Sequence, residues 1–251
     1  MKLSVRYITI LFVALVMAGV SSPVWSEGSL NLSADSKDQL KTLAANTRKR
    51  TMREREAMRR ARYDLLQVYS NYTIDERKAK SAQDKISAAQ LNLLNIHLDN
   101  EIALRSVLNA EQFHQFRKML SRHIGDGRML VVVSPEEDIL DKLPDKPMLD
   151  ALGVPVQKQR DLRPSNPKLI SDLKELSRQA MVLYGNYSLN EANCRKLIGS
   201  IHGKQKDLIS LQHHRQQTIR QVLNEDQFQK LQRELAKSVA KQQHRRYRKP
   251  H

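Results

Sequence analysis

The chain has 251 residues, of which 28% are charged, and its formal net charge is +16 at pH 7. A surface this basic attracts anions, namely acidic polypeptide segments, lipid head groups or nucleic acid. Aromatic residues make up only 5% of the chain, too few for the stacking platforms of single-strand nucleic-acid binders, and the single cysteine, Cys194, excludes an intramolecular disulfide.

Residues 1–26 have the pattern of a secretory signal peptide. Basic residues precede an apolar run over 8–20, and Val24 and Ser26 are the small residues before a cleavage site. The apolar run is shorter than the roughly 20 residues that span a bilayer, and an uncleaved anchor is the alternative. We expect cleavage near Ser26 and export, which argues against nucleic acid as the natural partner.

The segment 47–69, TRKRTMREREAMRRARYDLLQVY, is expected to form a strongly basic helix. Several of its arginines recur at helical spacing and so lie roughly on one face. Two interpretations stand level: a solvated face, or a surface that binds acidic or unfolded polypeptides. The candidate client-binding residues are Arg48, Arg53, Arg55, Arg59, Arg60 and Arg62.

An internal duplication follows the basic helix. Residues 69–120 align without a gap with residues 184–235, and fourteen of the 52 aligned positions are identical. The identical pairs include Tyr69/Tyr184, Asn71/Asn186, Tyr72/Tyr187, Glu76/Glu191 and Arg105/Arg220. The chain therefore contains two copies of one structural unit.

Each copy repeats a helix-start signal, VLNAEQF at 107–113 and VLNEDQF at 222–228. An asparagine N-cap with glutamine three residues later predicts a capping box, and the flanking Leu and Phe predict a hydrophobic staple. The motif residues are Leu108, Asn109, Gln112, Phe113, Leu223, Asn224, Gln227 and Phe228. Similar boxes are predicted earlier in each copy, with Thr73 and Ser188 as N-caps.

Between the two capping signals of each copy runs an uninterrupted helical pattern. A helix from 74 to 107 would be about 50 Å long, which favours an elongated helical hairpin. The first copy carries a second apolar stripe, Leu91, Leu94, Leu98 and Ile102. We expect it to pack on the preceding helix, and the alternative is an oligomer or client surface.

The sequence predicts an all-α chain of two such repeats, 27–124 and 169–236, joined by a linker. Six of the eight prolines lie within 125–168, which therefore reads as a Pro-rich linker with an apolar stretch, MLVVV, that could form a short strand. Residues 237–251 are basic and expected to be a disordered tail.

No motif predicts an enzyme or a resident cofactor. Metal binding is the rival function: His97 and Glu101 are four residues apart on a helix and could present two ligands, whereas the adjacent His213 and His214 point in different directions. We treat these four residues as weak candidates for zinc, nickel or copper.

The motif order resembles the periplasmic LTXXQ-motif family, which includes Spy- and CpxP-like chaperones and zinc-resistance-associated proteins. The matching segments are DERKAKSAQDKI followed by VLNAEQFHQFRKML, then LNEDQFQKLQREL, with LNLSADSKDQL at 30–40 similar to the family's earlier motif. Asn109 and Asn224 stand where the family has Thr, which preserves capping, whereas Ser36 leaves the earlier box incomplete. The second copy shows no clear upstream motif.

The resemblance implies an all-α hairpin fold whose members dimerise into a cradle and hold unfolded clients without ATP. It also implies envelope-stress or metal-resistance roles, with a membrane sensor kinase as a further partner. We expect a periplasmic holding chaperone or stress adaptor for unfolded or misfolded exported proteins. The two copies would form a pseudo-dimer within one chain, with a homodimer as the alternative, and a metal-binding sensor or buffer protein is the alternative function.

Overall fold

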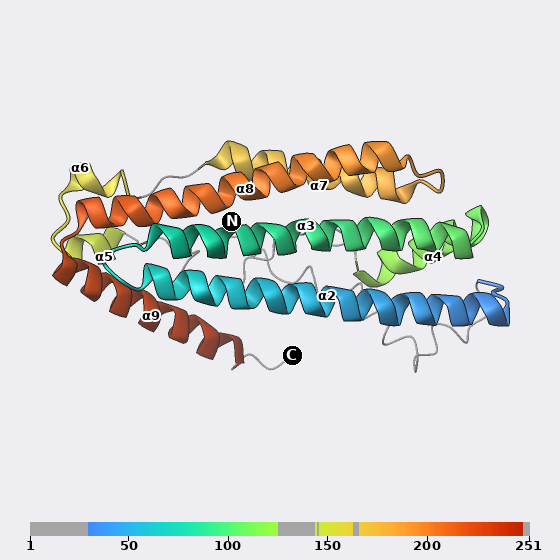
Figure 1. Cartoon of the computed structure of the whole chain (residues 1–251), viewed down its shortest axis with the longest axis horizontal. Coiled ribbons are helices and arrows are strands. Elements are labelled where there is room, and N and C mark those ends of the chain that lie inside the picture. Colours follow the sequence, from blue (N-terminus) through green and yellow to red (C-terminus); the bar gives the residue numbers. More distant parts are fainter. Residues whose placement is uncertain (1–29, 125–143, 145, 163–165, 248–251) are drawn as a thin grey trace. The chain divides into compact units, whose positions relative to one another are not determined.

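The computed structural model describes residues 30–124, 144, 146–162 and 166–247, and this part of the chain is all-α, as predicted (Figure 1). The predicted signal peptide and the MLVVV stretch lie outside the described residues. No helix in the described ranges has the length and apolarity that crossing a bilayer requires. The helices are α2 (Ala34–Tyr69), α3 (Glu76–Val107), α4 (Ala110–Ile124), α5 (Lys146–Ala151), α6 (Val156–Gln159), α7 (Pro167–Gly185), α8 (Glu191–Val222) and α9 (Glu225–Tyr247).

The duplication is visible in the helix bounds. Helices α3 and α8 are both 32 residues long, and α8 begins and ends 115 residues after α3 does. Helix α4 begins shortly after the end of α3, and α9 begins shortly after the end of α8, in both cases at the predicted capping box. The Gln112 amide donates to Asn109 Oδ1 (2.9 Å) and Gln112 Oε1 accepts from the Asn109 amide (3.1 Å), with the same two distances at Asn224 and Gln227.

The N-caps of α3 and α8 differ from the prediction. Asp75 and Asn190 cap these helices, since Asp75 Oδ1 accepts from the Lys78 amide and Asn190 Oδ1 from the Asn193 amide, both at 3.0 Å. Thr73 therefore does not start α3. The reason is physical: Asp and Asn cap as well as Ser or Thr, and both helices begin two residues later than the sequence analysis assumed. The hydrogen bond from the Lys78 amide also lowers the pKa of Asp75.

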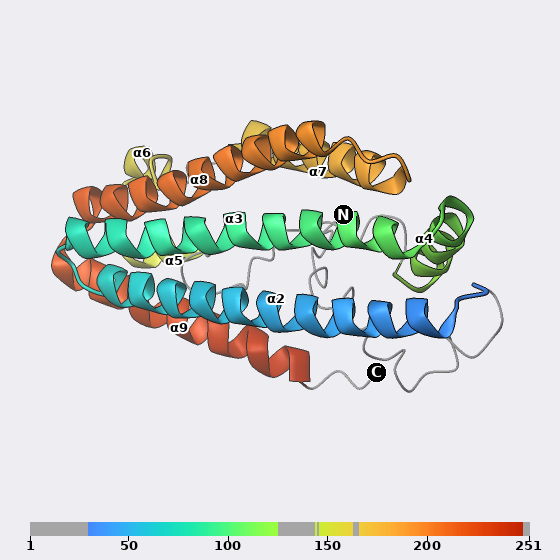
Figure 2. The same cartoon turned by 45° about the vertical axis from the view of Figure 1, so that its right-hand side comes forward.

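The chain divides into two compact units. Among the described residues, unit 1 comprises 30–58, 87–124 and 171–204, and unit 2 comprises 59–86, 144, 146–162, 166–170 and 205–247. Helices α2, α3, α7 and α8 contribute to both, so each unit contains segments of both copies. Figures 1 and 2 show α2 beside α3 in the unit 1 part, where Thr47 donates to Asn100 and Arg50 pairs with Asp99.

Each unit has its own core beneath a staple. In unit 1, Leu108 and Phe113 are buried in one cluster with Leu30, Leu40, Leu104 and Phe116. In unit 2, Leu223 and Phe228 are buried with residues of α5, α8 and α9 and of the turns beside α5. Leu94 and Leu98 of the second apolar stripe are buried while Leu91 and Ile102 are half-buried.

Part of the predicted linker is instead a folded element of unit 2. Leu149, Leu152, Val154 and Leu162 are buried in its core. The Gln227 side chain donates to the Leu152 carbonyl (2.8 Å), as the Gln112 side chain donates to the Asn31 carbonyl (3.2 Å) in unit 1. The second copy therefore has an upstream segment, although its sequence shows no clear upstream motif.

A left-handed residue marks this segment in both copies. Asn31 has φ +39° before the Ser33 cap of α2, and Gly153 has φ +68° before Pro155 at the start of α6. Glycine and asparagine adopt this conformation most readily. The predicted disordered tail also needs correction, because α9 continues through it to Tyr247.

The capping boxes give a first prediction. Replacing Asn109 or Asn224 by Ala is expected to lower the free energy of unfolding by about 1 kcal/mol each, because an amide at the helix start loses its acceptor. The two sites lie in different units, so in urea unfolding the effects should add to within about 0.5 kcal/mol in the double variant. A cost near zero at either site would contradict a structural role for that box.

Candidate functional site

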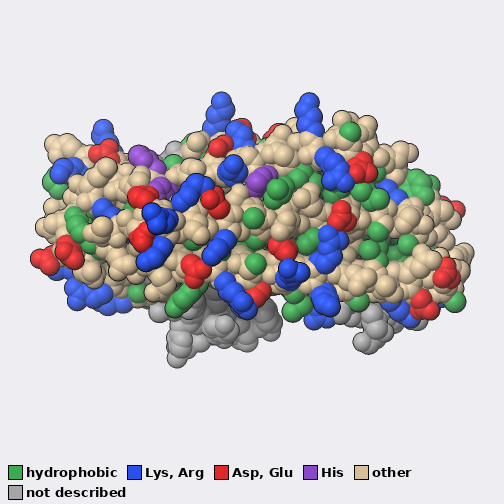
Figure 3. Space-filling model, viewed as in Figure 1, with side chains coloured by type: hydrophobic (Ala, Val, Ile, Leu, Met, Phe, Trp, Pro, Cys, Tyr) green, Lys and Arg blue, Asp and Glu red, His purple; other side chains and the backbone are tan. Residues whose placement is uncertain are grey.

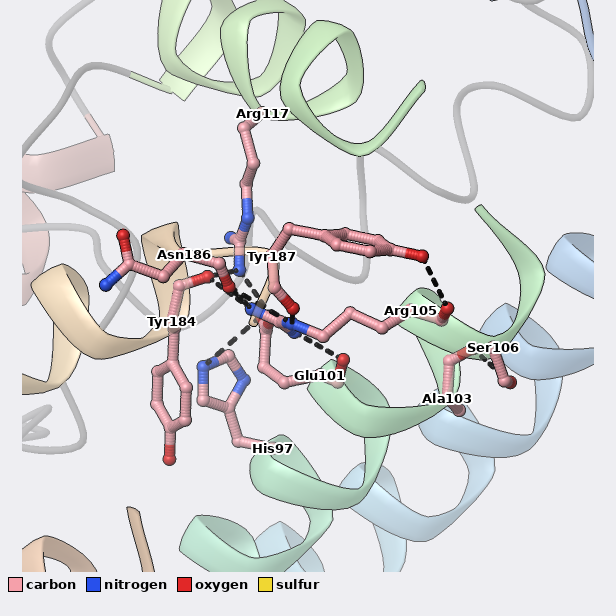
Figure 4. Close-up of polar contacts among 9 residues, drawn as sticks. All are labelled: His97, Glu101, Ala103, Arg105, Ser106, Arg117, Tyr184, Asn186 and Tyr187. Atoms are coloured by element: carbon pink, nitrogen blue, oxygen red, sulfur yellow. Dashed lines mark hydrogen bonds and ion pairs between the residues drawn. The ribbon is translucent and has the colours of Figure 1, made fainter. Parts of the chain in front are cut away.

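Unit 1 contains a dense polar contact between the two copies, which we call the unit 1 clasp (Figure 4). The Arg105 guanidinium, from the last turn of α3, donates to the carbonyls of Tyr184 (2.8 Å), Asn186 (2.7 Å) and Tyr187 (2.9 Å). These three carbonyls belong to the end of α7 and the turn after it, where backbone acceptors lack helical partners. One side chain of the first copy therefore satisfies the backbone of a turn in the second.

Tyr187 makes further contacts in the same clasp. Its hydroxyl donates to the Leu108 carbonyl (3.0 Å), next to the Asn109 cap. Its ring meets Phe113 edge-on at 5.7 Å, and the Arg105 guanidinium lies 4.4 Å from the centre of the Phe113 ring. The staple residue Phe113 is thus both a core residue and the platform on which the clasp is assembled.

Unit 2 repeats the arrangement with the copies exchanged, and we call it the unit 2 clasp. Arg220 donates to the carbonyls of Tyr69 and Asn71, each at 2.7 Å, and lies 4.6 Å from the centre of the Phe228 ring. The Tyr72 hydroxyl donates to the Leu223 carbonyl (2.8 Å). Burial lowers the pKa of Arg220 to about 10, so the guanidinium stays charged at neutral pH.

Only the unit 1 clasp contains a buried carboxylate. Glu101 is fully buried, and its Oε2 accepts from Arg105 (2.9 Å) and from Arg117 of α4. Arg117 also donates to the Tyr184 carbonyl (2.7 Å). In the second copy Gln216 stands in place of Glu101 and bonds Arg220 at 3.1 Å, so that clasp lacks the buried ion pair.

His97 adjoins this buried ion pair. Its Nε2 lies 4.0 Å from Glu101 Oε1, and its ring meets Tyr184 edge-on at 5.0 Å. Burial lowers the pKa of His97, an effect that Glu101 opposes and Arg117 supports. The imidazole is therefore neutral at pH 7, and taking up a proton costs more in the folded chain than in the unfolded one.

Because protonating His97 costs more in the folded chain than in the unfolded one, the free energy of unfolding is predicted to depend on pH. Below the unfolded-state pKa of about 6.5, His97 takes up a proton in the unfolded chain but resists it in the folded chain. The free energy of unfolding therefore decreases as the pH is lowered, by up to about 1.4 kcal/mol per pH unit. The variant His97→Gln, which copies Gln212 of the second repeat, should lose this component. The measurement is urea unfolding of both proteins at pH 7, 6 and 5. A stability difference that stays constant over this range would contradict the assignment.

The weak metal candidates divide between the two units. His97 and Glu101 are neighbours in unit 1, but two guanidinium groups occupy the carboxylate, which disfavours a cation there. In unit 2 His213 bonds the Tyr69 hydroxyl (2.8 Å) and pairs with Glu76 (3.0 Å), and His214 is exposed. Within the described ranges no group of three or more His, Cys, Asp or Glu side chains could hold a metal ion.

The predicted client-binding arginines are distributed over both units along α2. Arg48 and Arg53 are exposed in unit 1 and Arg59 and Arg60 in unit 2, whereas Arg55 and Arg62 are half-buried. Two large apolar side chains accompany them, Met52 (57% exposed) in unit 1 and Tyr63 (62% exposed) in unit 2. Lys and Arg side chains recur along α2 in Figure 3, with acidic ones between them.

The clasp residues were not singled out as a site from the sequence. The available signal was the identity of Arg105 and Arg220, and of the Asn-Tyr pairs before α3 and α8, in both copies. Cys194 is buried, and burial raises the pKa of its thiol.

Comparison with known proteins gives no match: no family model, no curated protein and no solved structure resembles the chain significantly. The resemblance to the LTXXQ-motif family therefore stays a prediction from the motifs.

Proposed function

We propose that the protein is an exported, nucleotide-independent holding chaperone or stress adaptor of the periplasm that binds unfolded or acidic polypeptides on the outer face of α2. The observation that supports this most is the composition of that face. In unit 1 it combines Arg48, Lys49 and Arg53 with an exposed Met52. In unit 2 the exposed Arg59 and Arg60 accompany Tyr63.

Such a face suits transient binding. Guanidinium and ammonium groups attract acidic segments from a distance, and a flexible Met side chain accepts apolar side chains of varied shape. Because the charges are exposed, the attraction should weaken with salt, as the Debye length falls from about 10 Å at 0.1 M to about 3 Å at 1 M.

Within this proposal one chain supplies both halves of the family's dimer. The reciprocal clasps support it. Each copy's arginine donates to the turn before the other copy's long helix, and each copy's tyrosine donates to a carbonyl at the end of the other copy's long helix. A sensor kinase and misfolded exported proteins are the proposed partners. The metal-binding alternative gains no supporting observation from the described residues.

The test is suppression of aggregation of a chemically denatured model protein at 50 mM salt and at 1 M salt. The variant Arg48→Glu/Lys49→Glu/Arg53→Glu should lose most of the suppression at low salt. A matched control, Lys196→Glu/Lys206→Glu/Lys230→Glu, changes the net charge equally at exposed positions on α8 and α9 and should retain it. Absence of suppression by the wild-type protein in stoichiometric excess at low salt would reject the proposed function.

A further inference from the structure

Unit 1 has a groove between the first turns of α2 and the last turn of α3. Its volume is about 430 Å³. Leu43, Ala103 and Val107 give it an apolar floor, and Ser106 lines it from α3. The remaining lining residues are polar and come from α2: Asp35, Asp38, Gln39, Thr42 and Asn46.

The face of α2 that lines the groove changes charge along the helix. Residues at intervals of three and four share one face of a helix, and here they change from acidic to neutral to basic. In order they are Asp35, Gln39, Thr42, Asn46, Lys49 and Arg53. The 18 residues between the ends span about 27 Å of helix, which an extended polypeptide covers in about eight residues.

In the second copy helix α5 belongs to the core against which the equivalent position packs. Val222, the counterpart of Val107, packs in the unit 2 core with Met148 and Leu149 of α5. In α5 this apolar pair stands between Lys146 and Asp150, whose side chains pair with each other (2.6 Å). Val107 packs in the same way against the unit 1 core and also lines the groove.

We infer that this groove binds a short polypeptide segment of about eight residues whose apolar centre is flanked by a cationic end and an acidic end. The apolar side chains would lie on Leu43, Ala103 and Val107, the cation beside Asp35 and Asp38, and the carboxylates beside Lys49 and Arg53. Charge complementarity fixes the orientation, because the reversed placement brings like charges together at both ends. The inference rests on the proposed function and specifies its client segment.

The test uses fluorescence anisotropy with the full processed chain and labelled ten-residue peptides. One peptide carries two Lys, a Leu-Leu centre and two Glu; a second replaces the leucines by serines. The first should bind, and the second should bind at least 10-fold more weakly. Ser106→Trp, which fills the groove, should weaken the first peptide at least 10-fold, whereas Gln221→Trp at the equivalent exposed position of copy 2 should stay within twofold of wild type.

Other outcomes overturn the inference. Equal binding of both peptides would mean attraction by charge alone, and unchanged binding by Ser106→Trp would place the peptide elsewhere. A concentration-dependent dimer that Ser106→Trp abolishes would make a second copy the occupant. If Ser106→Trp still suppresses aggregation like wild type while peptide binding is unaffected, the groove fails and the holding function stands. Failure of both readouts in the wild-type protein would reject the two proposals together.

Discussion

Replacing Arg105 by Met is expected to lower the free energy of unfolding by about 3–5 kcal/mol, the range measured for breaking a buried ion pair. Met keeps much of the side-chain volume but leaves Glu101 fully buried with Arg117 as its remaining cation. The carbonyls of Asn186 and Tyr187 also lose their donor. The measurement is urea unfolding at pH 7, followed by helix content.

The second copy provides the matched control. Arg220→Met removes the same contacts to backbone carbonyls, but its neighbour Gln216 is neutral, so no buried carboxylate is stranded. The expected cost is about 1–3 kcal/mol, the range for unsatisfied buried acceptors. Equal costs at the two arginines would show that the charge of Glu101 contributes nothing to the clasp.

Replacing Phe228 by Ala is expected to cost about 3–5 kcal/mol, as for other fully buried phenylalanines. The ring is fully buried in the unit 2 core, meets Tyr72 edge-on at 5.7 Å and lies under Arg220. Its removal therefore leaves a cavity and takes the platform from the unit 2 clasp.

Hydrogen exchange shows where this effect acts. Amides of α9 and of the last turns of α8 should lose protection in Phe228→Ala, because they enclose the same core. The milder Phe228→Leu variant should keep most of this protection from exchange, since a large apolar side chain still fills the site. A loss confined to α4 in unit 1, with α9 unchanged, would contradict the assignment of Phe228 to a local core.

The sequence was sufficient for the local features. Helical periodicity and the Asn–Gln capping pairs predict α3, α4, α8 and α9, because both signals depend on residues within one or two turns of each other. The cap at Asp75 was missed because several residues near a helix start can cap it, and only the backbone path decides which one does. The tail over 237–247 was misread because basic residues also form helices.

The clasps could not be predicted, because their acceptors are backbone carbonyls that leave no pattern in the sequence. Only the repeated Arg, Asn and Tyr residues hinted at them. The upstream segment of the second copy was missed for a similar reason: Leu152-Gly153-Val154 shares with Leu30-Asn31-Leu32 an apolar pattern and a left-handed middle residue, not a recognisable motif. On α2 the sequence does not distinguish the predicted arginines, but in the fold Arg55 and Arg62 are half-buried and their neighbours are exposed.

The most direct measurement asks where an unfolded chain touches the protein. A photo-crosslinking residue is placed at Met52, on the outer face of α2, and in a second protein at Ser200, an exposed position of α8. Each is irradiated with a denatured acidic model protein at 50 mM salt. The account predicts strong crosslinks from position 52 that fade at 1 M salt and few from position 200; equal or stronger crosslinking from position 200 would contradict it.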